Sequence, residues 1–154
     1  KNTHMKTKKS FKLSMLAVAA SAVFVFSLSS CASKTHFLTS TVVPAAQGTV
    51  EVKTDRNKNY VIEIDITNLS PSTRLSPPSN AYVVWLIAAD NSAQNLGQLN
   101  SSDRFMSKNL DAEFKTVTGI QPAKIMITAE NDPQVQYPSF SEVILATDFL
   151  NLKK

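Results

Sequence analysis

Acidic side chains occur at two places in the chain where their spacing would allow chemistry. Glu63 and Asp65 would lie about 7 Å apart on one face of a strand, a spacing that paired catalytic carboxylates could use. Both belong to the polar side of a regular strand, so a solvated face is the favoured interpretation. Glu130 and Asp132 lie where a strand should run into a loop. They form a candidate ligand loop for a cation or a sugar hydroxyl, although a loop capped by its own Asn and Asp side chains explains them more simply.

The other patterns that are typical of catalytic or metal sites are incomplete. His36 is the only histidine after Cys31, and no Gly-x-Ser-x-Gly motif accompanies it. We therefore expect a surface histidine and a protein that is not an enzyme. The run Asp55–Asn59 copies the first half of a calcium loop, but Tyr60 replaces the required glycine and Ile66 the bidentate glutamate. We expect a hairpin turn there, no metal site and no cofactor.

A different chemistry is indicated at Cys31, the only cysteine in the chain. A basic segment, Lys6–Lys12, is followed by the apolar run Leu13–Phe26. This run is short for a transmembrane helix, which needs about 20 apolar residues. The segment then ends in Leu28, Ser29, Ser30 and Cys31. This order resembles the signal peptide and lipobox of bacterial lipoproteins, and it implies that the Cys31 thiol receives a diacylglycerol before cleavage.

The same resemblance sets the expected domains and location. Residues 1–30 are upstream residues, with Met5 as initiator, and a signal peptide that is removed. Residues 31–35 form the lipidated cysteine and a tether, and 36–154 form one β-sandwich domain. Ala32 stands where Asp would signal retention in the inner membrane. We therefore expect a membrane-anchored lipoprotein on the periplasmic or cell-surface side, with the outer membrane favoured.

The formal net charge of +4 belongs to the segment before Cys31. Five of the sixteen Lys and Arg residues lie in it, which leaves eleven against twelve acidic residues. No electrostatic case for nucleic-acid binding remains. Because one cysteine cannot form a disulfide within the chain, the domain must fold on its apolar core alone.

Apolar residues after Cys31 alternate or form short runs, without the spacing of an amphipathic helix. The clearest strand is Asn59–Thr67, where apolar and polar residues alternate strictly. Other strands are expected at 37–43, 48–53, 81–88, 95–100, 112–117, 124–130 and 142–149. A loop rich in Ser and Pro, 68–80, separates two of them. About 7–8 short strands at near-regular spacing predict an all-β, antiparallel sandwich.

Three stretches resemble the extracytoplasmic C-terminal domain of anti-sigma-K factors: Tyr82–Ile87, Leu96–Leu99 and Ile127–Glu130. The resemblance covers roughly Ala81–Ala146 and implies an immunoglobulin-like β-sandwich. We find no sigma-binding segment, spanning helix or His-x-x-x-Cys-x-x-Cys zinc motif in the sequence. The resemblance therefore extends to the sensor-side domain alone, as in small lipoproteins that carry only this domain.

The strand expected at Ala81–Ala88 is apolar on both faces, so one face needs a cover. Neighbouring loops such as 68–80, or a partner protein, could supply it. Tyr82, Val84 and Leu86 form a candidate interface strand, while Trp85 is expected in the core. We expect a non-catalytic protein-interaction or envelope-structural role, with the membrane and an envelope protein as partners. The alternative is a glycan- or metal-binding accessory module on the cell envelope.

Overall fold

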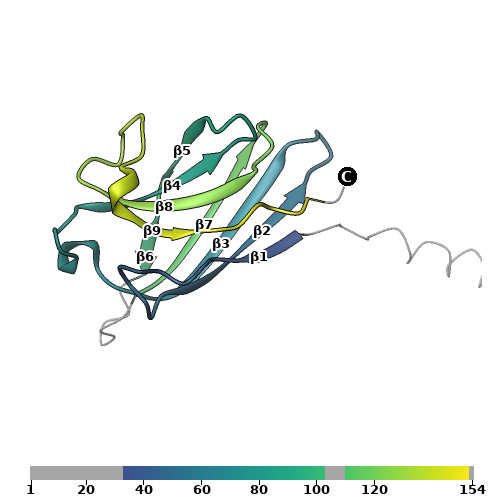
Figure 1. The fold of residues 1–154 in the computed structure, drawn as a ribbon. Helices are drawn as coiled ribbons and strands as arrows, with labels where there is room; N and C mark the ends of the chain where they lie inside the picture. Colours follow the sequence, from purple (N-terminus) through teal and green to yellow (C-terminus); the bar gives the residue numbers. More distant parts are fainter. Residues whose placement is uncertain (1–32, 103–109, 153–154) are drawn as a thin grey trace, which may run out of the picture. The chain divides into compact units, whose positions relative to one another are not determined.

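The computed structural model describes residues 33–102 and 110–152 (Figure 1). They form two antiparallel β-sheets that pack face to face. The first sheet has the strand order β1-β2-β3-β7-β6 and the second the order β5-β4-β8-β9. The strands are β1 (Ser33–His36), β2 (Gln47–Thr54), β3 (Tyr60–Leu69), β4 (Ala81–Ile87), β5 (Ala93–Gln98), β6 (Asn100–Ser102), β7 (Leu110–Thr118), β8 (Lys124–Glu130) and β9 (Val143–Ala146). Short 3-10 turns, η2 (Ser72–Arg74) and η3 (Phe140–Glu142), interrupt two of the loops.

The strand order is that of an immunoglobulin-like sandwich. Without β1, the first sheet reads β2-β3-β7-β6, which corresponds to the A-B-E-D order of that fold. The second sheet reads β5-β4-β8-β9, which corresponds to C′-C-F-G. The predicted fold class is thus confirmed, with nine strands among the described residues and β1 as an addition at one edge.

Alternation of side chains along the strands builds the core between the sheets. In β3, Ile62, Ile64 and Ile66 are buried, whereas the intervening Glu63 and Asp65 face outward. In β8, Ile125 and Ile127 face the same core. Ile and Val suit this position because their branched side chains pack well on a pleated, half-buried surface.

The segment after β1 joins the two sheets at one side. Phe37 forms a bridge with Thr147, and the backbone N–H of Leu38 donates to the carbonyl oxygen of Ala146 at 2.9 Å. The backbone N–H of Phe37 donates to the carbonyl oxygen of Gly48 at 3.1 Å. The chain therefore passes from the edge of the first sheet to β9 at the edge of the second.

The beginning of the domain differs from the sequence-based expectation. Ser33–His36 is a strand paired with β2, not part of a tether. The strand expected at 37–43 is instead mostly loop. No apolar residue in Ser33–His36 marks it as a strand, because β1 lies at the edge of the sheet and its side chains are half-buried or exposed. Residues 1–32, including the predicted signal peptide, Leu28, Ser29, Ser30 and Cys31, lie outside the described residues.

A bulge shapes β5, another element whose bounds differ from expectation. Gly97 pairs with Val84, but Asn95 pairs with Trp85, so Leu96 is an additional residue in the ladder. Gly97 has a φ of 129°, a conformation open to glycine and strained for other residues. The strand expected at 95–100 is divided between β5 in one sheet and β6 in the other.

Candidate binding surface

Tyr82, Val84 and Leu86, the candidate interface strand, lie in the core between the two sheets. Their side chains are 5%, 0% and 0% exposed. The first sheet covers them, so they cannot meet a partner in the folded protein. Burial raises the pKa of Tyr82 to about 12, and its hydroxyl donates to the carbonyl oxygen of Ser70 at 2.7 Å. The 68–80 loop therefore closes this core and is not the cover of the opposite face.

The opposite face of the second sheet, called here the outer face, carries a second apolar cluster. Val83, Trp85 and Met126 are its buried members, and the loop residue Val135 packs against them. Trp85 is fully buried, as predicted. The loop 131–142 between β8 and β9 covers this face, because Val135 packs on it and Asn95 of β5 binds the loop backbone.

A chain of hydrogen bonds fixes the far end of the 131–142 loop to the sheet. The indole Nε1 of Trp85 donates to Thr128 Oγ1 at 2.8 Å, and Thr128 Oγ1 donates to Glu130 Oε1 at 2.6 Å. Ser139 donates to the same carboxyl group twice, through its backbone N–H at 2.8 Å and its Oγ at 2.7 Å. Every polar atom of this buried chain thus has a partner, which a buried polar group requires.

The near end of the loop is fixed to β5 by one amide side chain. Asn95 Nδ2 donates to the carbonyl oxygens of Pro133 at 3.0 Å and Val135 at 2.8 Å. Asn95 Oδ1 accepts from the backbone N–H of Gly97 at 2.8 Å.

Between β5 and the loop lies a groove of about 530 Å³ whose described lining residues carry no formal charge. Its polar side chains are amides: Gln94, Asn95, Gln98, Gln134 and Gln136.

The candidate ligand loop is engaged within the protein. Glu130 is 4% exposed, and both of its carboxyl oxygens accept hydrogen bonds from neighbouring residues. Asp132 is exposed, and its Oδ1 accepts from the backbone N–H of Gln134 at 2.8 Å, which caps the loop. This geometry favours the capped-loop interpretation over a ligand at Glu130. Among the described residues, no three His, Cys, Asp or Glu side chains converge as metal ligands would.

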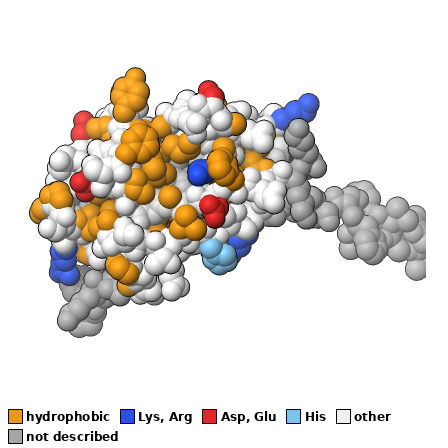
Figure 2. Space-filling model, in the orientation of Figure 1, with side chains coloured by type: hydrophobic (Ala, Val, Ile, Leu, Met, Phe, Trp, Pro, Cys, Tyr) orange, Lys and Arg blue, Asp and Glu red, His pale blue; other side chains and the backbone are white. Residues whose placement is uncertain are grey.

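Two exposed aromatic side chains belong to the 131–142 loop, and a third, Phe149, lies at the opposite end of β8. Tyr137 is 83% exposed, Phe140 71% and Phe149 70%. The ring centre of Phe149 is 4.2 Å from the Nζ of Lys124. Lys124 and Met126 are two residues apart on β8 and therefore share a face, so Phe149 lies on the outer face. Figure 2 shows hydrophobic side chains gathered over β9 and this loop. We call Tyr137 and Phe140 the aromatic patch.

Sequence reasoning did not identify the aromatic patch or Asn95. The signal available was the presence of Tyr137 and Phe140 in a loop with two prolines, where large apolar residues have no strand to bury them. The role of Asn95 left no such signal, because its partners lie 38 and 40 residues away in the sequence.

The acidic pair on β3 belongs to a solvated face, as the alternation predicts. Glu63 forms ion pairs with Lys53 at 3.0 Å and with Lys115. The hydrogen bond from Lys115, followed by that from Lys53, lowers the pKa of Glu63. Asp65 is exposed and stands opposite Glu113 of β7. Glu63 and its two lysine partners therefore form a group of ion pairs that does not include Asp65.

Two further predictions about polar residues are confirmed. His36 is an exposed residue at the end of β1. Asp55–Asn59 is the turn of the β2–β3 hairpin, and Asp55 Oδ1 accepts from the backbone N–H groups of Asn57 and Asn59, each at 2.8 Å. These hydrogen bonds, that of Asn59 first, lower the pKa of Asp55.

The described part of the chain defines an immunoglobulin-like β-sandwich with an aromatic loop across one sheet. It contains no helix long and apolar enough to cross a membrane. Comparisons of the sequence with protein-family models and curated proteins, and of the fold with solved structures, give no significant match.

Proposed function

We propose that this protein is a lipid-anchored, extracytoplasmic β-sandwich that binds an envelope protein through the aromatic patch. The observation that carries the proposal is the exposure of Tyr137 and Phe140 in the loop whose Val135 packs on an apolar sheet face. Solvent-exposed aromatic side chains are costly to leave in water and are enriched at protein interfaces. Lipidation of Cys31 would hold this surface in the cell envelope.

The support of the 131–142 loop suits an interface. Glu130 and Asn95 bind its two ends through hydrogen bonds to Ser139, Pro133 and Val135. A loop that is already fixed loses little conformational freedom on binding, which favours affinity. The role is non-catalytic, and the resemblance of Ala81–Ala146 to the sensor-side domain of anti-sigma-K factors is in keeping with a domain that engages other envelope components.

The experiment that tests this interface compares two sets of variants in crosslinked native membranes. Tyr137→Ser with Phe140→Ser should abolish recovery of the partner and leave thermal stability within a few degrees of the wild type. Val117→Ser is the matched control, because Val117 is 56% exposed but lies on the first sheet. It should leave recovery unchanged. Equal recovery with all variants would rule out the aromatic patch as the interface.

A second candidate function is supported by the groove beside β5. Its amide side chains can both donate and accept hydrogen bonds, as the hydroxyl groups of a neutral sugar do. Tyr137, next to Gln136 in the sequence, could stack on a sugar ring. A ligand that binds only the folded state raises the melting temperature. Neutral oligosaccharides should then raise the melting temperature of the wild type and not that of the double variant Gln94→Ala with Gln136→Ala. The same measurement with calcium tests for a metal-binding module.

A further inference from the structure

Only one residue separates the proposed lipidation site from the first strand. Cys31 is followed by Ala32, and β1 begins at Ser33. Ser33 pairs with Val52 of β2, and its Oγ donates to the carbonyl oxygen of Asn151 at 2.9 Å. Two extended residues span at most about 7 Å. A lipid on Cys31 would therefore hold the end of the sandwich where β1 begins directly against the membrane.

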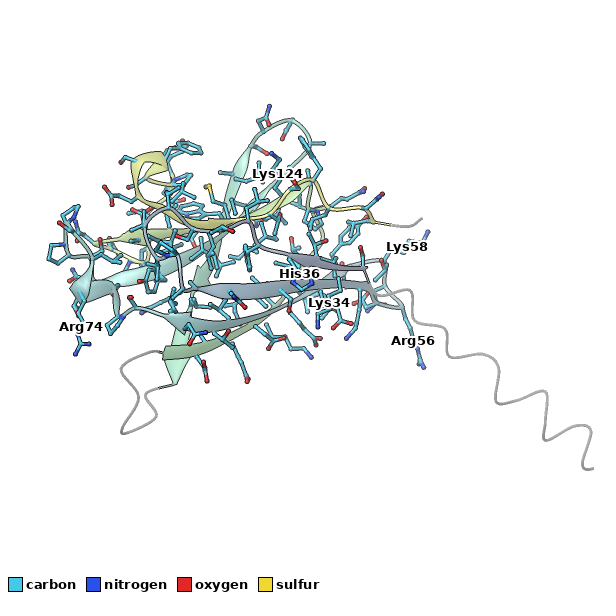
Figure 3. All side chains as sticks on the ribbon, turned by 60° about the horizontal axis from the view of Figure 1, so that its bottom comes forward. Lys34, His36, Arg56, Lys58, Arg74 and Lys124 are labelled. Atoms are coloured by element: carbon cyan, nitrogen blue, oxygen red, sulfur yellow. The ribbon has the colours of Figure 1, made fainter. Side chains whose placement is uncertain are left out.

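The register of the first sheet identifies the other elements at that end. Ser33 pairs near the end of β2, and Thr54 of β2 pairs with Tyr60 of β3. Tyr60 in turn pairs with Thr118, the last residue of β7. The β2–β3 turn, 55–59, and the loop 119–123 therefore lie at the end where β1 begins. Figure 3 shows Arg56 and Lys58 at this end and Arg74 at the opposite one.

The β2–β3 turn is held in one conformation and presents two cations. Asp55 binds the backbone of Asn57 and Asn59, and its Oδ2 also accepts from Asn59 Nδ2 at 3.2 Å. Lys58 has a φ of 64°, which these contacts hold in place. Arg56 and Lys58 are exposed. Neither forms an ion pair with another described residue.

The neighbouring loops complete a surface suited to a lipid headgroup region. Ile120, in the loop 119–123 at the same end, is 44% exposed and offers an apolar side chain. Asp90, in the β4–β5 turn of the second sheet, lies at the same end, since Ile87 pairs with Lys124. Its Oδ1 accepts from the backbone N–H and the hydroxyl of Ser92. Asp55 and Asp90 are thus hydrogen-bonded within their own turns, whereas Arg56 and Lys58 of the β2–β3 turn are exposed.

We propose that Arg56 and Lys58 dock on the phosphates of anionic phospholipids once Cys31 carries its lipid. This inference rests on the lipid anchor of the proposed function. Docking would fix the orientation of the sandwich, with the β2–β3 turn on the membrane and the opposite end directed away from it. Each basic residue close to an anionic surface adds to the attraction, and salt weakens it.

The orientation can be measured with the lipidated protein in vesicles. A lipidated Cys31 has no free thiol, so Asn57→Cys and Thr73→Cys each provide a single site for a fluorophore. Asn57 lies in the β2–β3 turn, and Thr73 in η2 at the opposite end is the matched control. The vesicles contain either phosphatidylcholine alone or phosphatidylcholine with phosphatidylglycerol, each with a spin-labelled lipid as quencher. Mass spectrometry of the N-terminal peptide checks the lipid on Cys31.

In vesicles with phosphatidylglycerol, the label at position 57 should be quenched at least threefold more than the label at 73. The difference should shrink in phosphatidylcholine, in 0.5 M salt and in the variant Arg56→Gln with Lys58→Gln. Quenching at 57 that is independent of all three changes, or equal quenching at 57 and 73, would overturn the docking while the anchor stands. Absence of the lipid on Cys31 would overturn the anchor itself, and the docking with it.

Discussion

Ser139 donates two hydrogen bonds to Glu130, at 2.8 Å from its backbone N–H and at 2.7 Å from its hydroxyl. Glu130 ends β8, and Ser139 lies near the end of the following loop. One buried carboxyl group thereby closes the 131–142 loop across the outer face. This relationship assigns to Glu130 a structural role that its position at the end of a strand did not reveal.

Glu130→Gln should lower the free energy of unfolding by about 1–3 kcal/mol, because the amide nitrogen cannot accept the hydrogen bonds that one carboxyl oxygen accepts. Urea denaturation measures the change. Glu142→Gln is the control, since Glu142 is a half-buried acid in the same loop. Equal losses for both variants would contradict the role of Glu130.

Stability should fall in alkaline solution because of Tyr82. Its pKa is raised to about 12 by burial, whereas a tyrosine in the unfolded chain ionises near 10. The folded state holds the proton more tightly, so its contribution is complete below pH 10 and is lost as the pH rises toward 12. Two units correspond to about 3 kcal/mol. Urea denaturation between pH 9 and 12 should show this loss in the wild type and a smaller one in Tyr82→Phe.

Acid should also destabilise the domain, in part through Asp55. Hydrogen bonds from the backbone of Asn59 and from other groups in the turn lower its pKa. Its contribution is present above pH 4, the ordinary carboxyl range, and is lost as the pH falls through the lowered value. Asp55→Ala should therefore flatten the stability profile below pH 4. A profile unchanged by this substitution would show that the turn does not depend on the carboxylate.

Gly48→Ala should destabilise the protein by about 1–3 kcal/mol through overpacking. A Cβ atom at position 48 would lie 2.8 Å from the backbone oxygen of Asp65 and 3.0 Å from the ring of Phe37. Gly119→Ala is the matched control, since the nearest atom to its added Cβ is 3.9 Å away. Thermal unfolding of the two variants should differ by several degrees, and similar melting temperatures would contradict the close packing at Gly48.

The sequence predicted the strands whose pattern is local and could not predict contacts between distant segments. β3 and β8 were identifiable because their alternation or apolar run is unbroken, and the structure gives β8 the expected bounds, Lys124–Glu130. In β4 both faces are apolar, so the pattern alone did not decide that Tyr82 faces the core. The cover of the outer face depends on hydrogen bonds such as that between Asn95 and Val135, 40 residues apart.

The central claim is that a lipid anchor presents the aromatic patch to an envelope protein. A photo-crosslinking amino acid placed at position 140 tests it most directly, with the same amino acid at position 65 as the control on the exposed face of the first sheet. Each form is made with Cys31 and with Cys31→Ser behind a cleavable secretion signal. One discrete adduct at position 140, only with Cys31 intact and absent at position 65, is the predicted result. No adduct, or the same adducts at both positions, would contradict the account.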